Sequence, residues 1–301
     1  MKKLFTLIVV CLLFTLANAQ KTVAVMTPYL ASATTKIMVD SLEAALTEKG
    51  YIVTVVDTAG DVAALDSRMQ DVITQQVDAI VISVNPELVP AGLEAAAGAN
   101  IPVFGMDAGS TQGLVLDVTS NNYVMAAQTA TYIVDRIGGQ GRVLMLWHPP
   151  YAPVQKRGAV AESIFRNTPD IEIIDQILVE VPGPLENARQ KVTDVLTANP
   201  EPGSISAIWA AWDEPALGAL QAIEAAGREG EGIVIVGLDA IDPAREAIAA
   251  AGNFEASVAQ DFVGIATTVA DNVEAYLNGT TPVAKTIYVP ATLVTKENAM
   301  Q

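Results

Sequence analysis

A buried strand, a polar corner and the start of a helix follow one another in Ile208-Trp209-Ala210-Ala211-Trp212-Asp213-Glu214-Pro215-Ala216-Leu217-Gly218-Ala219-Leu220. Pro215 near the first helical position sacrifices no backbone hydrogen bond, and Asp213 is expected to cap the helix. In an open parallel α/β sheet, such corners lie at the carboxyl ends of the strands, where ligands bind.

Three other expected strands end in a polar or aromatic side chain of the same kind. These are Asp107 after residues 102–106, Trp147 after residues 142–146 and Asp239 after residues 234–238. Because parallel strands end at a common edge of the sheet, such side chains are predicted to line a small-molecule cleft. Binding alone accounts for this pattern, and catalysis is not required.

Strand-like and helix-like segments alternate along most of the chain. Strands are expected at residues 22–26, 51–56, 78–84, 102–106, 114–118, 142–147, 171–179, 207–212, 232–238, 255–260 and 286–289. Amphipathic or capped helices are expected between them. This order predicts parallel sheets covered by helices on both faces. At about 150 residues per domain, 301 residues suggest two similar doubly wound lobes. Because no Pro-, Gly- or Ser-rich linker separates the halves, several crossings between them are expected.

The charge balance excludes one large class of partner. The chain has 17 Lys and Arg against 34 Asp and Glu, a net charge of −17, and a pI near 4.3. Such a surface repels phosphate backbones, so nucleic-acid binding is not expected. The hydrophobic share of 51% is enough for large buried cores and argues against disorder.

The N-terminus has the pattern of an export signal. Met1-Lys2-Lys3 is followed by an apolar run over residues 4–16 and by Ala17-Asn18-Ala19, a small-residue cleavage pattern. Residues 1–19 are therefore predicted to be a signal peptide, and the mature protein to be exported and soluble. The single cysteine, Cys11, lies within this segment, so no disulfide is expected. A lipoprotein signal is disfavoured because Val10 precedes the cysteine.

Enzyme motifs are missing from the sequence. There is no G-x-S-x-G elbow, phosphate-binding loop of the G-x-x-x-x-G-K-[ST] type or H-E-x-x-H helix. The only histidine, His148, cannot build a multi-histidine metal site, and it either bonds within a pocket or lies at the surface. It belongs to the stiff aromatic segment Trp147–Tyr151, which is typical of a pocket wall. We expect no enzyme activity, no cofactor and no metal.

Several polar candidates have a structural alternative. Asp107 ends its strand as a turn residue or contacts a ligand. Asp239 is the stronger ligand candidate, because Asp242 before Pro243 is the better cap of the next helix. Asn122 is equally suited to capping and to ligand contact. Asn85 before Pro86 favours a turn or cap, with its strand-end position keeping it as a candidate.

Arg157 and the tryptophans complete the residues chosen from local pattern. Arg157 falls in the early turns of its helix, where the helix dipole disfavours a cation. A solvated surface arginine is the default, but this local cost and the family resemblance described below both favour a role in the cleft. Its fork of donors suits vicinal hydroxyls. Trp147 and Trp212 end their strands and are candidates for stacking on a sugar ring, whereas Trp209 lies in mid-strand and is expected in the core.

Three segments, residues 100–107, 212–220 and 235–239, resemble those of type I periplasmic sugar-binding proteins of the ribose-binding kind. Residues 120–122 and 256–260 add weaker similarity, and the resemblance runs from Lys21 to about Val294. It implies two lobes joined by three crossovers and closing on a ligand. The lobes would comprise residues 20–122 with 261–289, and residues 123–260 with 290–301.

The resemblance implies a monomeric periplasmic receptor that takes a sugar or polyol to an ABC-type permease. The alternative function is that of a periplasmic ligand sensor for a chemoreceptor or sensor kinase. A carbohydrate-active enzyme is a third and less favoured alternative. Tyr29 and Gln260 join the ligand-binding candidates on this basis, with a hinge role equally open for Gln260. Thr34, Thr35, Ala108 and Trp212 depart from the ribose-binding pattern, so a hexose, deoxysugar or polyol fits as well as ribose.

Overall fold

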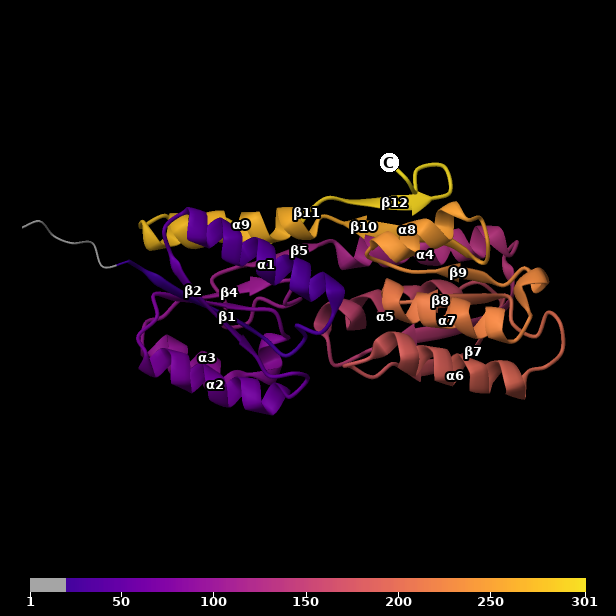
Figure 1. Cartoon of the computed structure of the whole chain (residues 1–301), viewed down its shortest axis with the longest axis horizontal. Coiled ribbons are helices and arrows are strands. Elements are labelled where there is room, and N and C mark those ends of the chain that lie inside the picture. Colours follow the sequence, from indigo (N-terminus) through magenta and orange to yellow (C-terminus); the bar gives the residue numbers. More distant parts are fainter. Residues whose placement is uncertain (1–19) are drawn as a thin grey trace, which may run out of the picture.

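Two α/β lobes lie side by side along the long axis of the molecule (Figure 1). The structure is a computed structural model that describes residues 20–301. The predicted signal peptide at residues 1–19, with Cys11, lies outside the described residues. Among those described, no helix is both long and apolar enough to cross a membrane.

The first sheet has the strand order β11-β5-β4-β3-β1-β2, and every pairing in it is parallel. Its strands are β1 (Thr22–Thr27), β2 (Ile52–Asp57), β3 (Ala79–Ile82), β4 (Val103–Met106), β5 (Asp117–Ser120) and β11 (Thr286–Val289). One face is covered by α1 (Ala33–Glu48) and α9 (Phe262–Leu277), the other by α2 (Val62–Thr74), the short η1 (Pro86–Leu88) and α3 (Pro90–Gly98) (Figure 1). Strand β1 is buried on both sides, so its apolar run feeds both core layers.

The second sheet has the order β12-β10-β9-β8-β6-β7. Its strands are β6 (Gln140–Trp147), β7 (Asp170–Leu178), β8 (Ala207–Ala210), β9 (Val234–Val236), β10 (Phe254–Gln260) and β12 (Ala291–Thr295). Its helices are α4 (Asn122–Arg136), α5 (Ala152–Arg166), α6 (Pro184–Ala198), α7 (Asp213–Ala225), the short η2 (Glu229–Glu231) and α8 (Asp242–Ala249). Helix α4 packs against α5, and α6 packs against α7. Only β12 runs antiparallel to its neighbour.

The two sheets repeat one topology, β2-β1-β3-β4-β5 in the first and β7-β6-β8-β9-β10 in the second. The chain passes between them three times, through α4, through α9 and at Pro290 between β11 and β12. The predicted fold class, two similar doubly wound lobes joined by three crossovers, is confirmed.

Two of the differences from the expected strands have a clear physical reason. Strand β5 begins at Asp117 instead of residue 114, because the preceding residues form the turn after β4. No strand was expected beyond residue 289, but Ala291–Thr295 pairs with β10. Pro290 ends β11 and lets the chain leave the first sheet, and the partner strand lies too far back in sequence for a local pattern to reveal the pairing.

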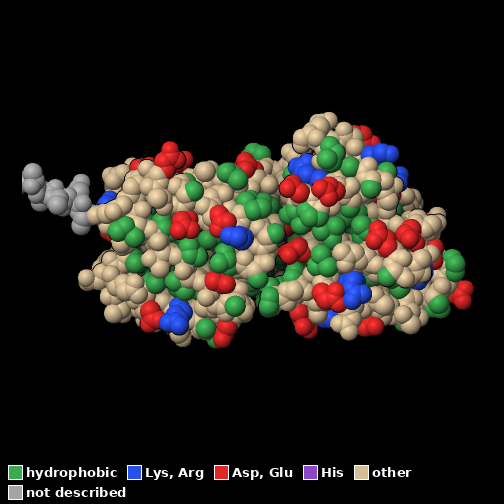
Figure 2. All heavy atoms as spheres, viewed as in Figure 1, with side chains coloured by type: hydrophobic (Ala, Val, Ile, Leu, Met, Phe, Trp, Pro, Cys, Tyr) green, Lys and Arg blue, Asp and Glu red, His purple; other side chains and the backbone are tan. Residues whose placement is uncertain are grey.

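Acidic side chains are spread over the visible face of both lobes and are more frequent there than basic ones, as Figure 2 shows. The surface therefore carries the negative charge that the composition predicts. The same view shows the two lobes meeting at a narrower waist.

Candidate ligand-binding site

A cavity lies between the lobes, at the carboxyl ends of their strands. It encloses about 650 Å³ of empty space, part of it open to solvent. The first lobe contributes Tyr29, Ala31, Ser32, Thr34, Thr35, Met38, Asp107 and Phe262, and the second contributes His148, Tyr151, Val154, Arg157, Val181, Pro182, Gly183, Pro184, Trp212, Glu214, Asp239 and Gln260. The lining is mainly apolar, with a few charged side chains among it, which is typical of a site for a small molecule.

Asp107 and Asp239 occupy equivalent places in the two lobes. Each comes after the fourth strand of its lobe in chain order, β4 or β9. Each backbone N–H still bonds the neighbouring strand, at 2.8 Å to Val118 O and Val258 O respectively. Both have a positive φ, 53° for Asp107 and 115° for Asp239. Such backbone costs about 1 kcal/mol or more in a residue other than glycine, and it is typical of ligand-binding turns.

A second pair of carboxylates fixes these turns from behind. Asp117 accepts hydrogen bonds from the backbone N–H of Ala108, at 3.0 Å, and of Gly109, at 2.9 Å. Asp213 accepts from the Ile241 N–H at 2.9 Å and from Ser257 Oγ at 2.7 Å. The turns that present Asp107 and Asp239 are thus preorganised by buried side chains.

The role of Asp213 corrects a sequence-based expectation. Helix α7 begins at Asp213 itself and has no side-chain cap. Asp242 likewise lies in the first turn of α8 without capping it. A capping preference describes local sequence alone, whereas Asp213 is fully buried and bonds groups 28 and 44 residues away.

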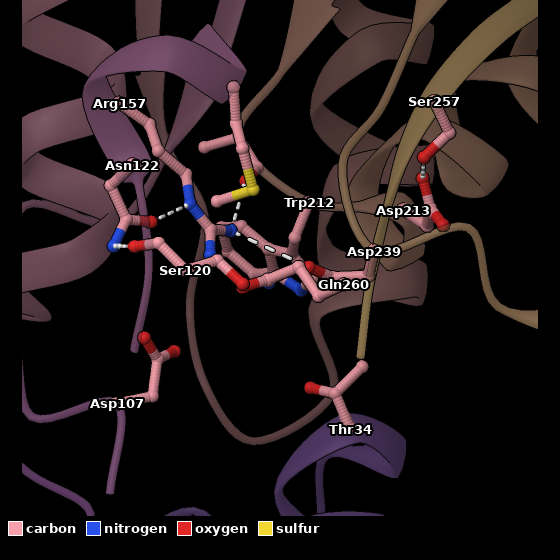
Figure 3. A network of polar contacts seen from close by, with 12 residues as sticks. Thr34, Asp107, Ser120, Asn122, Arg157, Trp212, Asp213, Asp239, Ser257 and Gln260 are labelled. Atoms are coloured by element: carbon pink, nitrogen blue, oxygen red, sulfur yellow. Dashed lines mark hydrogen bonds and ion pairs between the residues drawn. The ribbon is translucent and has the colours of Figure 1, made fainter. Parts of the chain in front are cut away.

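Arg157 is 2% exposed and is fixed by groups from three elements. Its Nε donates to Asn122 Oδ1 at 2.6 Å and its Nη1 donates to Ala211 O at 2.9 Å. Nη1 also lies 3.6 Å from Asp239 Oδ1 (Figure 3). Asn121, not Asn122, caps α4. Asn122 instead orients the guanidinium at the point where the chain first crosses between the lobes.

Asp239 therefore has a structural role that the sequence did not indicate. It balances Arg157, and its Oδ1 accepts from Gln260 Nε2 at 2.7 Å. Burial raises the pKa of Asp239 to about 7, with Arg157 opposing the rise. Burial raises the pKa of Asp107 as well, and Arg157 again opposes it. The single positive charge of Arg157 thus stabilises the charged forms of both carboxylates.

Contacts across the cleft hold the lobes in a closed arrangement. Tyr151 Oη donates to Asp107 O at 2.6 Å and to its Oδ2 at 3.1 Å. Ser32 Oγ donates to Glu214 Oε2 at 3.1 Å. The rings of Tyr29 and Tyr151 meet edge to face, with centroids 5.2 Å apart. Figure 3 shows Thr34 and Asp107 facing Arg157, Trp212 and Asp239 across the cavity.

Three candidates do not line this cavity. Asn122, which bonds Arg157, lines a second cavity instead. Trp147 does not line this cavity, because its ring packs so closely on Gly158 of α5 that a Cβ there would overlap it. Asn85 accepts from the Glu87 N–H at 3.2 Å as the cap of η1 and lines the same second cavity. Among the other tryptophans, Trp212 lines the cavity and Trp209 is fully buried, as predicted for a core residue.

Sequence reasoning did not single out Glu214 or Phe262, and it treated Tyr151 only as part of a wall segment. Glu214 stands in the first turn of α7, and its Oε2 accepts from Trp212 Nε1 at 3.2 Å. Glu214 lies two residues after Trp212, in the polar corner that follows the strand expected at residues 207–212. That position at the carboxyl end of a strand could have marked it as a site residue. Among residues 20–301, no group of three or more His, Cys, Asp or Glu is arranged to hold a metal ion.

Asp117 is expected to make the free energy of unfolding depend on pH. Burial raises its pKa from 3.8 to about 7. The folded state therefore binds a proton that the unfolded state releases between these values, so this stabilisation is complete below pH 4 and lost as the pH rises through 7. Urea unfolding should show the stability of the wild type relative to Asp117→Asn to be larger at pH 5 than at pH 8, by roughly 2 kcal/mol. A constant difference across this range would contradict the assignment.

Comparison with known proteins identifies the family. Residues 23–281 match the model described as periplasmic binding protein domain. The chain is 30% identical to the ribose import binding protein RbsB of Bacillus subtilis (strain 168), over 83% of this chain and 79% of that one. An ABC transporter solute binding protein from Agrobacterium vitis, solved with bound allitol, has a TM-score of 0.88 at 30% identity, covering 93% and 97% of the chains. An ABC sugar transporter subunit from Rhodobacter sphaeroides 2.4.1 has a TM-score of 0.87 at 29% identity, covering 92% and 99%. This chain belongs to the periplasmic binding protein family.

Proposed function

We propose that this protein is an exported receptor that binds a sugar or polyol between its lobes and delivers it to an ABC-type permease. The observation that carries the proposal is the pair Asp107 and Asp239, presented from opposite lobes around the buried Arg157. Carboxylates accept from ligand hydroxyls and the guanidinium donates to them, so a polyhydroxylated ligand satisfies both lobes at once.

The relatives support the ligand class. One is named for ribose import and another was solved with allitol, a linear polyol. Trp212 and the two tyrosines, Tyr29 and Tyr151, offer apolar ring faces to the C–H side of such a ligand. The export signal at residues 1–19, with cleavage after Ala19, would bring the receptor to the periplasm, and the mass of the exported protein tests this step.

Closure on ligand accounts for the contacts that span the cleft. Tyr151 bonds Asp107, and Ser32 bonds Glu214, only if the two lobes stand close together. A ligand that contacts both lobes favours this arrangement because an open form lacks half of its contacts. We expect the ligand-free protein to sample a more open form.

Thermal-shift screening of sugars and polyols on the purified mature protein tests the function. A ligand at a thousandfold excess over Kd stabilises the folded state by about 4 kcal/mol, so Tm should rise clearly. The ligand should be recovered chemically unchanged, and small-angle scattering should show compaction. Recovery of a hydrolysed or oxidised compound would favour an enzyme instead, and a tight ligand without compaction would contradict the closing receptor.

A further inference from the structure

The charges that line the cavity do not balance. Among the described residues that line it, Asp107, Glu214 and Asp239 are carboxylates and Arg157 is the one guanidinium. Arg157 lies 3.6 Å from Asp239 and also acts on the charge of Asp107. If the protein binds a sugar or polyol as proposed above, the excess of carboxylates in this lining favours a ligand that also carries a positive charge.

Glu214 is the carboxylate of this lining that forms no ion pair among the described residues and whose pKa Arg157 does not shift. Its Oε2 accepts from Ser32 Oγ and from Trp212 Nε1, both of them uncharged donors. No lysine, arginine or histidine of residues 20–301 pairs with it within 4.0 Å. Burial raises its pKa, and the two hydrogen bonds oppose the rise. A cationic group brought by the ligand would complete this site.

The remaining polar groups also call for a ligand that donates. Gln260 is 8% exposed, and because its Nε2 bonds Asp239, its Oε1 is left as a buried acceptor with no partner among the described residues. His148 Nδ1 lies 2.9 Å from Val179 O, so it carries the hydrogen there. Burial lowers the pKa of His148, so the ring is neutral and its Nε2 is an acceptor.

We propose that the ligand is an amino sugar or amino polyol, whose ammonium group binds between the Glu214 carboxylate and the indole of Trp212. Tryptophan is the best side chain for cation–π contact, and Glu214 is hydrogen-bonded to its ring nitrogen. The ligand hydroxyls would bond Asp107, Asp239 and Arg157. This assignment rests on the proposed function and narrows its ligand class.

Matched pairs of compounds test the assignment. Calorimetry at pH 7 compares D-glucosamine with D-glucose, D-galactosamine with D-galactose, and 1-amino-1-deoxy-D-glucitol with D-glucitol. In at least one pair, the amine should bind at least about tenfold more tightly, because a charge-assisted hydrogen bond replaces a neutral one. Glu214→Gln should reduce that preference to less than about threefold, since the amide still accepts from Ser32 and Trp212 but carries no charge.

Glu224→Gln is the control, because Glu224 is exposed on the same helix, α7, and should leave the preference unchanged. Equal or tighter binding of the neutral member in every pair that binds overturns the amine assignment and leaves the proposed function intact. A preference for the amine that survives Glu214→Gln overturns the placement at Glu214. Failure of all six compounds to bind counts against the amine assignment, whereas the proposed function fails only if the wider screen of sugars and polyols also finds no ligand.

Discussion

Asp239→Asn is expected to weaken binding of the protein's sugar or polyol by about 100-fold. The carboxylate accepts from ligand hydroxyls, and each hydrogen bond to a charged group contributes about 1.5 to 3 kcal/mol. The substitution also removes the ion pair with Arg157, leaving that guanidinium without its nearest counter-charge. Asparagine keeps the size of the side chain and an acceptor for Gln260 Nε2, so the turn should survive. Calorimetric titration with the ligand found by thermal shift measures the effect.

Asp242→Asn is the matched control for this change. Asp242 lies three residues further along the same turn, is exposed, and does not cap α8. Its substitution should leave Kd within about twofold of the wild-type value, because a surface charge contributes little. If Asp239→Asn binds as tightly as the wild type, Asp239 does not contact the ligand and the cavity is not the binding site.

The ligand-free stability of Asp239→Asn is a further readout. From the sequence alone, Asp239 has no structural task, so the apo-protein would keep its Tm. The structure places it beside a buried arginine, and a buried charge that loses its partner destabilises the fold by several kcal/mol when nothing compensates. Because Asp107 and two hydrogen bonds remain near Arg157, we expect a loss of about 1 to 2 kcal/mol.

The fold could be predicted because its signal is local and repeated. Strand β3 is apolar along its whole length and β1 is apolar between its terminal threonines. The helices between such strands have recognisable start and stop residues. Parallel topology then follows from the β-α alternation. Strand β12 was missed because its pairing with β10 joins residues more than 30 positions apart and leaves no local mark.

The site residues that could be predicted from the sequence are those that lie near the end of a strand. Asp107 directly follows β4, and Trp212 and Asp239 lie within three residues of the ends of β8 and β9. The structure brings all three to one cavity. Trp147 is the last residue of β6, yet its ring packs on α5, since backbone position does not determine which way a large side chain turns.

Other parts of the site depend on contacts between distant segments. Tyr151 reaches Asp107 across the cleft, and Glu214 meets Ser32 from the other lobe, 182 residues away. Neither contact has a local pattern in sequence. The buried position of Asp213 was hidden for a similar reason, because an acidic residue before a proline has the local appearance of a cap.

Gly237→Ala is expected to destabilise the second lobe by about 3 to 5 kcal/mol. A Cβ at this position would overlap Asp213 Oδ1 and lie 2.9 Å from Phe254 Cζ. Asp213 cannot move away without breaking its bonds to Ser257 and the Ile241 N–H, which hold the turn of Asp239. Overpacking costs about 1 to 3 kcal/mol, and disturbing hydrogen bonds to a buried carboxylate adds a similar amount.

Urea unfolding and ligand titration should report this damage together. Stability falls because the core is strained, and affinity falls because the Asp239 turn is displaced. Gly252→Ala is the control in the same lobe, since a Cβ there meets nothing within 4 Å and its φ is not positive. That variant should match the wild type or gain a few tenths of a kcal/mol, because alanine restricts the unfolded chain. Gly105→Ala should repeat the Gly237 effect in the first lobe, where the added Cβ would lie 2.5 Å from Asp117 Oδ1. Wild-type stability in both glycine variants would mean that the buried carboxylates do not fix the binding turns.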